Sequence, residues 1–148
     1  MARKIEMQKY ESTVEGAIDD AMSAFEELGS ECREVCDNMP ESLQSTDRYS
    51  TLDETANELE YLSAPDVPEC VSGLTVTFSY KPQRRMSRSD RRHEAIRTIE
   101  AAKDAAQEWL DDKANAEHDQ RDEVETLVSE IDDIVGTAEN VEFPGMFG

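Results

Sequence analysis

Apolar residues recur at alternating steps of three and four along the first 28 residues of the chain. This spacing is the heptad pattern, which lays one apolar stripe along a helix and packs it against a second helix. Pro40 ends the pattern, because proline lacks a backbone N–H and clashes with the preceding helical turn. We therefore predict a helix over residues 1–38, with a seam formed by Met7, Tyr10, Val14, Ala21 and Leu28.

A narrow seam also accounts for the composition of the chain. Leu, Ile, Val and Phe supply only 27 of the 148 residues, and the formal net charge is −20. Such a composition is typical of disordered chains, and it argues against sandwiches, barrels and doubly wound sheets, which bury many aliphatic side chains. Because a heptad seam requires few apolar residues, we expect the chain to fold.

Two elements are expected after the connector that follows Pro40. Thr51 and Glu54 form a capping-box pattern, which predicts a second helix over residues 51–63. The alternation of apolar and polar residues up to Tyr80 then predicts a β-hairpin over residues 67–80. An isolated hairpin is marginal in water, so it must lie on the helices or pair with another chain. Its candidate partner-binding residues are Leu74, Val76, Phe78 and Tyr80.

The second half of the chain predicts one long helix over residues 88–138, capped by Ser87 and Asp90. Residues 111–123 lack the apolar stripe and form either a solvent-crossing stretch of helix or a turn. We favour the helix, because every residue type there is compatible with it. An apolar tail occupies residues 139–148. The expected fold is a single domain, 1–148, mainly α: an elongated antiparallel helical bundle or coiled coil with one inserted β-hairpin.

Charge is distributed unevenly along the chain. Residues 1–80 carry 18 acidic and five basic side chains, and residues 94–148 carry 16 and four. Between them, a basic connector over residues 81–93 carries six basic side chains and one acidic. Arginine binds carboxylates and phosphates with a two-pronged fork, so the connector can pair with the acidic arms, dock an acidic protein or contact nucleic acid. We favour internal or inter-subunit pairing for Arg84, Arg85, Arg88, Arg91 and Arg92.

The acidic arms allow three explanations: a solvated face, adaptation to high salt, or mimicry of nucleic acid. Residues 104–133 carry twelve acidic and two basic side chains, spread over about 45 Å if they form one helix. That is about one charge per 4.5 Å, compared with about 1.7 Å in duplex DNA and 3.4 Å along one strand. In composition alone, the chain resembles the acidic phage inhibitors of restriction and CRISPR enzymes.

Neither an enzyme nor a cofactor is expected. Motifs for phosphate-binding loops, zinc proteases and nucleophile elbows are absent from the sequence, and the three cysteines and two histidines lack metal-ligand spacing. Glu130 and Asp133 resemble half of the magnesium motif of all-α nucleotide pyrophosphohydrolases, but the matching EExxE element is missing. With neither a signal sequence nor a membrane span, we expect a soluble intracellular protein or a component of a viral particle.

The sequence favours a non-enzymatic protein–protein interaction or assembly protein, a structural or adaptor subunit that binds a protein partner or forms a homo-oligomer. The alternative is an acidic mimic that inhibits a DNA- or RNA-binding protein. A third function is contact with nucleic acid through residues 81–93, and nucleic acid is the less favoured partner. The residues expected to insert into a partner's groove, or to pack over the end of the helices instead, are Phe143, Met146 and Phe147.

Overall fold

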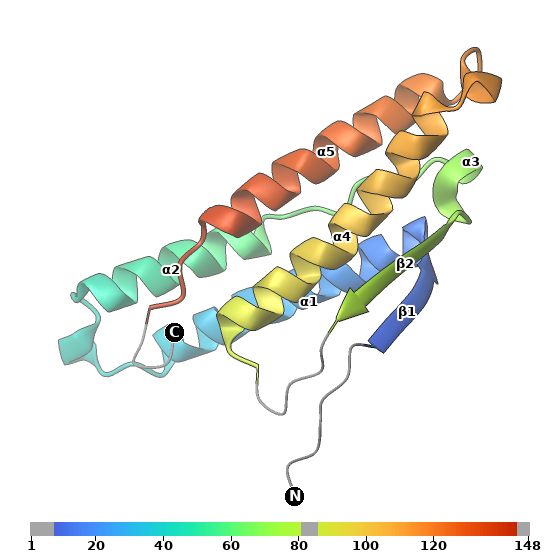
Figure 1. The fold of residues 1–148 in the computed structure, drawn as a ribbon. Helices are drawn as coiled ribbons and strands as arrows, with labels where there is room; N and C mark the ends of the chain where they lie inside the picture. The colour runs from blue at the N-terminus through green and yellow to red at the C-terminus, as the bar shows by residue number, and fades with distance from the viewer. Residues whose placement is uncertain (1–7, 81–85, 145–148) are drawn as a thin grey trace, which may run out of the picture.

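The structure is a computed structural model that describes residues 8–80 and 86–144 (Figure 1). It is mainly helical, with a small two-stranded antiparallel sheet. Two short 3-10 turns lie between helices. In chain order the elements are β1 (Gln8–Thr13), α1 (Val14–Asp37), η1 (Glu41–Leu43), α2 (Asp47–Glu60), α3 (Glu69–Ser72), β2 (Thr75–Tyr80), α4 (Arg88–Asp111), η2 (Lys113–Asn115) and α5 (Arg121–Asn140).

The prediction of a helix over residues 1–38 is wrong over residues 8–13 and correct from Val14, and its first seven residues lie outside the described residues. Residues Gln8–Thr13 form strand β1, and α1 begins where the Thr13 hydroxyl oxygen accepts a hydrogen bond from the Gly16 N–H at 3.0 Å. A stretch of six residues is too short for a heptad spacing to be distinguished from the pattern of a strand. The β-favouring Thr13 and the pairing with β2 make this stretch a strand.

The predicted hairpin over residues 67–80 is also wrong, although its second arm is a strand. Residues Glu69–Ser72 form the single helical turn α3, and β2 pairs with β1 in antiparallel register, placing Tyr10 opposite Phe78. Pro68 precedes that turn as its N-cap residue, and its carbonyl oxygen accepts hydrogen bonds from the Val71 and Ser72 N–H groups, both at 3.1 Å. The strand partner therefore comes from the opposite end of the sequence, which local patterns cannot reveal.

The predicted second helix begins earlier than expected. Its start is Asp47 and not residue 51, because the Thr46 hydroxyl oxygen accepts a hydrogen bond from the Tyr49 N–H at 3.3 Å. It ends at Glu60 rather than residue 63, five residues before Pro65.

The single helix expected over residues 88–138 is two helices, α4 and α5, joined by a turn. No glycine or proline is needed, because side chains satisfy the backbone groups that the turn frees. The Asp112 carboxylate accepts from the Ala114 N–H at 2.9 Å, and Asn115 and Arg121 donate to the carbonyl oxygens of Trp109 and Leu110 at 2.9 and 2.8 Å. The chain then folds back, and α5 packs against α4.

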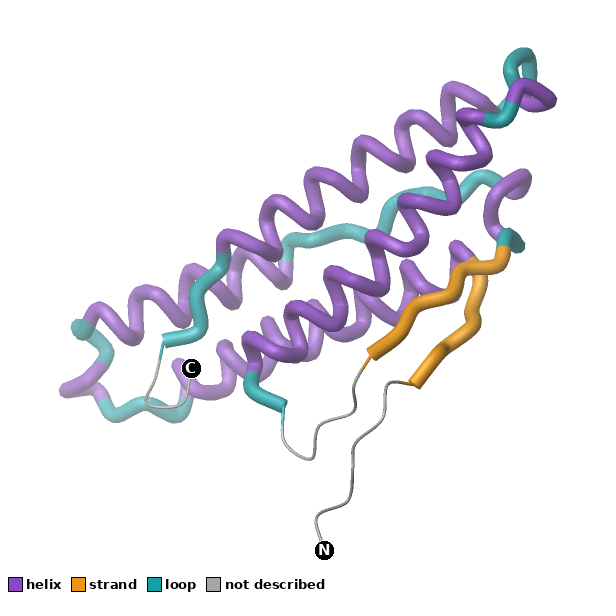
Figure 2. Tube along the Cα trace, viewed as in Figure 1, coloured by secondary structure: helices purple, strands orange, loops and turns teal. Residues whose placement is uncertain are grey.

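Helix α1 lies at the centre of the packing, in contact with α2 and α4, while α5 covers α4 (Figure 2). The long helices follow a common direction, and the strand pair lies beside α4 and the first half of α1. At Gly29 the helices α1 and α2 approach closely, because a Cβ there would lie 3.1 Å from the Leu59 Cβ. The largest fully buried side chains are Phe25, Ile18, Leu28, Leu52, Leu59, Ile99, Leu127 and Ile131.

Candidate functional site

Three of the five arginines predicted to bind a partner lie in the first turn and a half of α4, namely Arg88, Arg91 and Arg92. The helix starts at Arg88 because the Ser87 hydroxyl oxygen accepts from the Asp90 N–H at 3.0 Å, while the Asp90 carboxylate accepts from the Ser87 N–H at 3.3 Å. This is the capping box that the sequence predicts. The other two predicted arginines, Arg84 and Arg85, lie outside the described residues.

Arg91 joins α4 to α1 through a forked contact with Glu31. One guanidinium nitrogen donates to the Glu31 carboxylate at 2.8 Å, and the second donates to its other oxygen. Arg88 adds a contact of 3.4 Å to Glu31, and Glu27 lies 3.7 Å from Arg91. The hydrogen bond from Arg91 lowers the pKa of Glu31 despite partial burial, and that of Arg91 is raised by the same hydrogen bond. Internal pairing therefore occupies two of the predicted partner-binding arginines.

Arg92 holds the C-terminal tail against the helices. Its guanidinium donates to the Val141 carbonyl oxygen, and its central carbon lies 5.2 Å from the centroid of the Phe143 ring. The Thr55 hydroxyl donates to the Glu142 carbonyl oxygen at 2.6 Å. Phe143 is only 8% exposed, so it packs within the molecule. Met146 and Phe147 lie outside the described residues.

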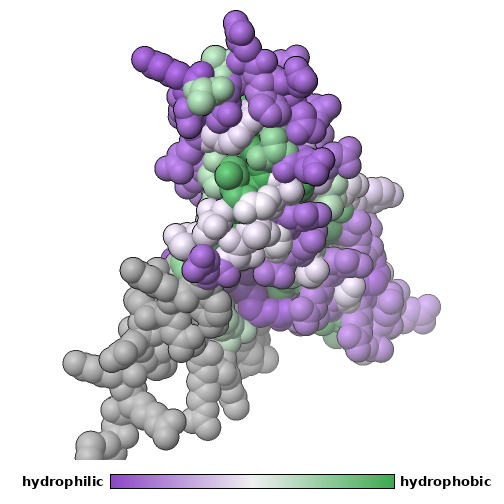
Figure 3. Space-filling model, turned by 90° about the vertical axis from the view of Figure 1, so that its right-hand side faces the viewer, coloured by the Kyte–Doolittle hydropathy of each residue, from purple (hydrophilic) through white to green (hydrophobic). Residues whose placement is uncertain are grey.

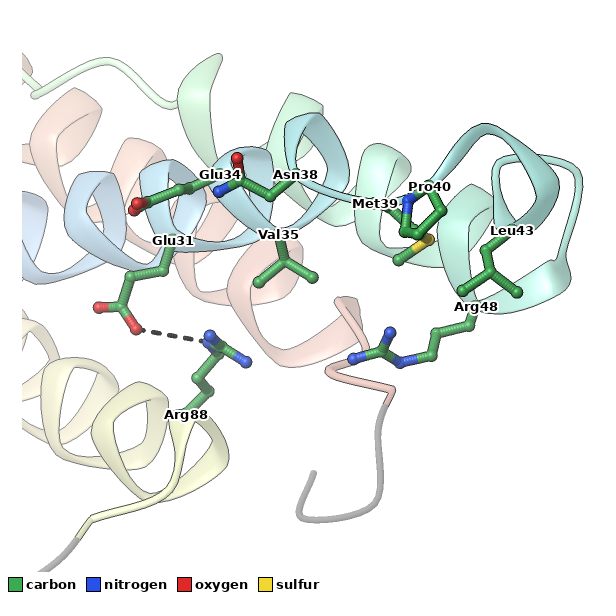
Figure 4. A pocket seen from close by; sticks show the side chains of 9 residues that line it. All are labelled: Glu31, Glu34, Val35, Asn38, Met39, Pro40, Leu43, Arg48 and Arg88. Carbon is green, nitrogen blue, oxygen red and sulfur yellow. Dashed lines mark hydrogen bonds and ion pairs between the residues drawn. The ribbon is translucent and has the colours of Figure 1, made fainter.

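A shallow groove of about 470 Å³ lies between the end of α1, η1 and the starts of α2 and α4 (Figure 4). Val35, Met39 and Leu43 supply its apolar surface, and Leu43 is 46% exposed. Arg48 and Arg88 reach toward it from different helices. The groove can hold an apolar side chain, and Arg88 is already engaged by Glu31.

Several strand and seam residues also pack within the molecule. Val76 is 3% exposed, Leu74 is partly buried against the core, and Phe78 is partly buried. Tyr80 closes the ladder opposite Gln8. The seam residues of α1 are fully buried, as expected for helix packing, while Tyr10 lies in β1 and Met7 falls outside the described residues. The buried seam residues are Val14, Ala21 and Leu28.

A further candidate surface is the acidic hairpin, defined as residues 104–133 of α4, η2 and α5. All twelve of its carboxylate side chains are exposed. Two of them have basic neighbours: Asp132 lies 2.9 Å from Lys103 Nζ, and Glu125 lies 3.7 Å from Arg121. The hydrogen bond to Asp132 raises the pKa of Lys103. The remaining carboxylates face solvent without a basic partner among the described residues.

Folding the acidic hairpin back on itself nearly doubles its charge per unit length. Its helical parts, residues 104–111 and 121–133, carry nine acidic and one basic side chain within the length of residues 121–133, about 20 Å at 1.5 Å per residue. This is about one charge per 2.5 Å, which lies between the spacing in one strand of DNA and that in the duplex. The single helix expected from the sequence would have had little more than half this density. The sequence argument identified the acidic segment but underestimated its charge density, because it favoured one helix over a turn.

A small apolar area interrupts the acidic surface at the end of the molecule where the α4–α5 turn and α3 lie (Figure 3). Hydrophilic residues border it above and at the sides, and residues of intermediate hydropathy lie below it. Partly buried apolar side chains in this part of the chain are Cys70 of α3, Leu74 just before β2 and Trp109 near the end of α4. The Trp109 ring meets the His118 ring edge to face, with centroids 5.0 Å apart. An apolar area with a largely hydrophilic border has the general anatomy of a protein interface.

Within residues 8–80 and 86–144, no three His, Cys, Asp or Glu side chains lie close enough to hold a metal ion together. Cys32 and Cys36 are buried in α1, and burial raises the pKa of both thiols. Across the same ranges, no helix combines the length and apolar character needed to span a bilayer.

Comparison of the chain with models of known protein families, with curated proteins and with solved structures gives no match.

Proposed function

We propose that this protein is a non-enzymatic interaction protein, a structural or adaptor subunit whose acidic hairpin binds a basic surface of a protein partner. The observation that carries the proposal is the hairpin itself: nine exposed carboxylates on two packed helices within about 20 Å, and three more in the turn that joins them. Such a surface repels nucleic acid and anionic lipid, and it attracts a basic protein over a distance of several ångströms.

The intramolecular contacts of the other candidate residues support this choice of surface. Arg91 and Arg92 are engaged by Glu31 and the tail, and Phe143 is buried. The contacts of α1 with α2 and α4, and of α4 with α5, support an elongated antiparallel bundle as the scaffold. A rigid pair of packed helices holds the carboxylates in fixed positions, which reduces the entropy lost on binding.

The proposal is tested by capture of partners from the native source with two matched variants. The hairpin variant removes four exposed charges, and the control variant removes four by the same substitutions elsewhere. The hairpin changes are Asp104→Asn, Glu108→Gln, Glu130→Gln and Asp133→Asn, and the control changes are Asp19→Asn, Asp37→Asn, Glu54→Gln and Glu58→Gln. We expect a basic partner to be retained by the wild type and the control, and to be lost from the hairpin variant.

A second candidate function, inhibition of a nucleic-acid-binding protein by mimicry, is favoured by the charge spacing. At about one charge per 2.5 Å, the packed helices of the hairpin lie midway between the values of about 3.4 Å for one strand and about 1.7 Å for the duplex. Mimicry predicts that the captured partner also binds DNA or RNA, and that nucleic acid displaces the protein in competition. A partner that binds the protein and nucleic acid simultaneously would contradict mimicry and leave the adaptor function.

A further inference from the structure

Strand β1 is the outer strand of the small sheet. In Figures 1 and 2, β2 lies on the side of α4, and β1 lies on the outside. Within the described ranges, β1 forms a ladder with β2 and with no other strand. The backbone N–H and C=O groups on the outer edge of a strand can pair with a strand from another chain.

The backbone groups on this edge can be identified from the ladder. The Val14 N–H donates to the Leu74 carbonyl oxygen at 3.0 Å, in line with the register of the two strands. In an antiparallel ladder, the hydrogen-bonding groups of successive residues alternate between the two edges. The backbone groups of Ser12 and Tyr10 therefore face β2, and those of Lys9 and Glu11 face outward.

The two residues whose backbone groups face outward, Lys9 and Glu11, carry opposite charges. Across the ladder, Lys9 is opposite Ser79 and Glu11 is opposite Thr77, and both residues of β2 are uncharged. Glu11 and Thr77 are exposed, whereas Val76, the residue before Thr77 in β2, is buried. The positions of Lys9 and Glu11 thus share the face of the sheet that is turned away from the core.

We infer that the outer edge of β1 binds the same edge of a second copy, in antiparallel register about Tyr10. This register places Lys9 of each copy opposite Glu11 of the other, so a two-fold axis generates two opposite-charge pairs. Both pairs are formed by residues whose backbone groups face outward, so the register also forms inter-chain ladder hydrogen bonds. The result is a continuous four-stranded sheet.

The charges select this register over its neighbours. Residues whose backbone groups face outward must pair with each other, so neighbouring registers differ by one such residue in their pairing. In the proposed register the numbers of two paired residues add up to about 20, and in the nearest alternatives they add up to about 18 or 22. One shift places Lys9 opposite Lys9, and the other places Glu11 opposite Glu11, and like charges directly opposite are destabilising. The outer edge of β2 offers only Thr and Ser at the corresponding positions and runs beside α4, so it lacks this selectivity.

The self-association is tested by measuring the mass of the full chain against concentration by light scattering, in about 0.15 M salt. At this ionic strength the Debye length is about 8 Å, so repulsion between the distant acidic surfaces is screened while contacting pairs are retained. We expect the mass to rise with concentration from 16.7 kDa toward twice that value. A mass that stays at 16.7 kDa up to about 1 mM, a concentration at which even millimolar affinity is detected, would overturn the inference.

Charge reversal distinguishes this edge from any other contact. Lys9→Glu alone and Glu11→Lys alone each create two like-charge pairs, so we expect each variant to dissociate at least tenfold more readily. The double variant Lys9→Glu with Glu11→Lys keeps the net charge and restores opposite pairs, so it should associate like the wild type. Mixing the two single variants should also restore association, which shows in the same experiment that both remain folded.

Two results would contradict the proposed edge: single variants that associate as the wild type does, or a double variant and a mixture that both remain dissociated. The inference does not depend on the function proposed for the acidic hairpin. The hairpin variant with four neutralised carboxylates should associate at least as well as the wild type, because Lys9 and Glu11 are unchanged. Loss of partner capture with retained self-association, or the reverse, therefore separates the two proposals.

Discussion

At the scale of single residues, the ion pair between Arg91 and Glu31 holds α4 against α1. Both side chains are about one-third exposed, and they join the first turn of α4 to the second half of α1. Because a forked arginine–carboxylate contact forms two charge-assisted hydrogen bonds, it fixes the relative positions of the helices more firmly than a simple ion pair. Most of the other carboxylates have no such role.

Replacing Glu31 by Gln should lower the free energy of unfolding by about 1–2 kcal/mol at pH 7, a range that allows for partial exposure of the pair to solvent. Chemical denaturation measures the change. Glu34→Gln is the matched control, because Glu34 is exposed on the same helix and forms no ion pair with a described residue. The control should lie within about 0.5 kcal/mol of the wild type.

The pH dependence of this difference has a definite sign. Arg91 lowers the pKa of Glu31 in the folded state from its ordinary value of 4.5. A carboxylate with a lowered folded-state pKa stabilises the fold fully above its unfolded pKa, and this contribution is lost as the pH falls through the folded value. The stability difference between wild type and Glu31→Gln should therefore be constant above about pH 5.5 and shrink below pH 4.5. A difference that persists unchanged to about pH 3 would exclude this origin.

At the scale of elements, local chemistry predicts helix starts well where a capping residue has one clear partner. Ser87 and Asp90 mark the start of α4 in the sequence and in the structure. Thr51 and Glu54 give the same kind of signal but lie inside α2, because Thr46 caps that helix first. A capping pattern therefore identifies a compatible site, and the surrounding chain decides whether it is used.

Ser87→Ala should destabilise the protein by about 1 kcal/mol through loss of the capping box. Ser89→Ala is the control, because Ser89 lies inside the first turn of α4 and does not cap it. The control should be neutral or slightly stabilising, since alanine favours a helix. Equal effects of the two substitutions in thermal denaturation would show that the capping box does not determine the start of α4.

Elements whose definition depends on distant partners were not predictable. The pairing of β1 with β2 joins residues nearly seventy positions apart, so a heptad spacing over Met7, Tyr10 and Val14 favoured a helix instead. The turn between α4 and α5 lacks glycine and proline and depends on Asn115 and Arg121 reaching back to carbonyl oxygens of α4. The strand pairing needs a long-range contact, and the turn needs side-chain hydrogen bonds to backbone groups 6 and 11 residues away, which residue propensities do not reveal.

At the scale of the whole molecule, the fold determines where the net charge of −20 is exposed. Basic residues of α4 are engaged by α1 and by the tail, whereas the acidic hairpin gathers twelve carboxylates into a short length. Leu28 of the seam is buried, as expected for helix packing, and Phe143 of the tail is buried against the helices, the second of the two arrangements expected for it. The sequence located the acidic segment correctly, and the fold determined its charge density.

The most direct test of the central proposal is the salt dependence of partner binding by the wild type and the two matched variants. For a captured partner held by the acidic hairpin, the logarithm of the affinity should fall linearly with the logarithm of the salt concentration, as it does for polyanions. At about 0.15 M salt, the hairpin variant should bind the partner at least about tenfold more weakly than the wild type, as expected for the loss of surface charge. Its affinity should also depend less steeply on salt concentration. The control variant should match the wild type in both affinity and salt dependence. Equal affinities and slopes for the two variants would contradict the proposal.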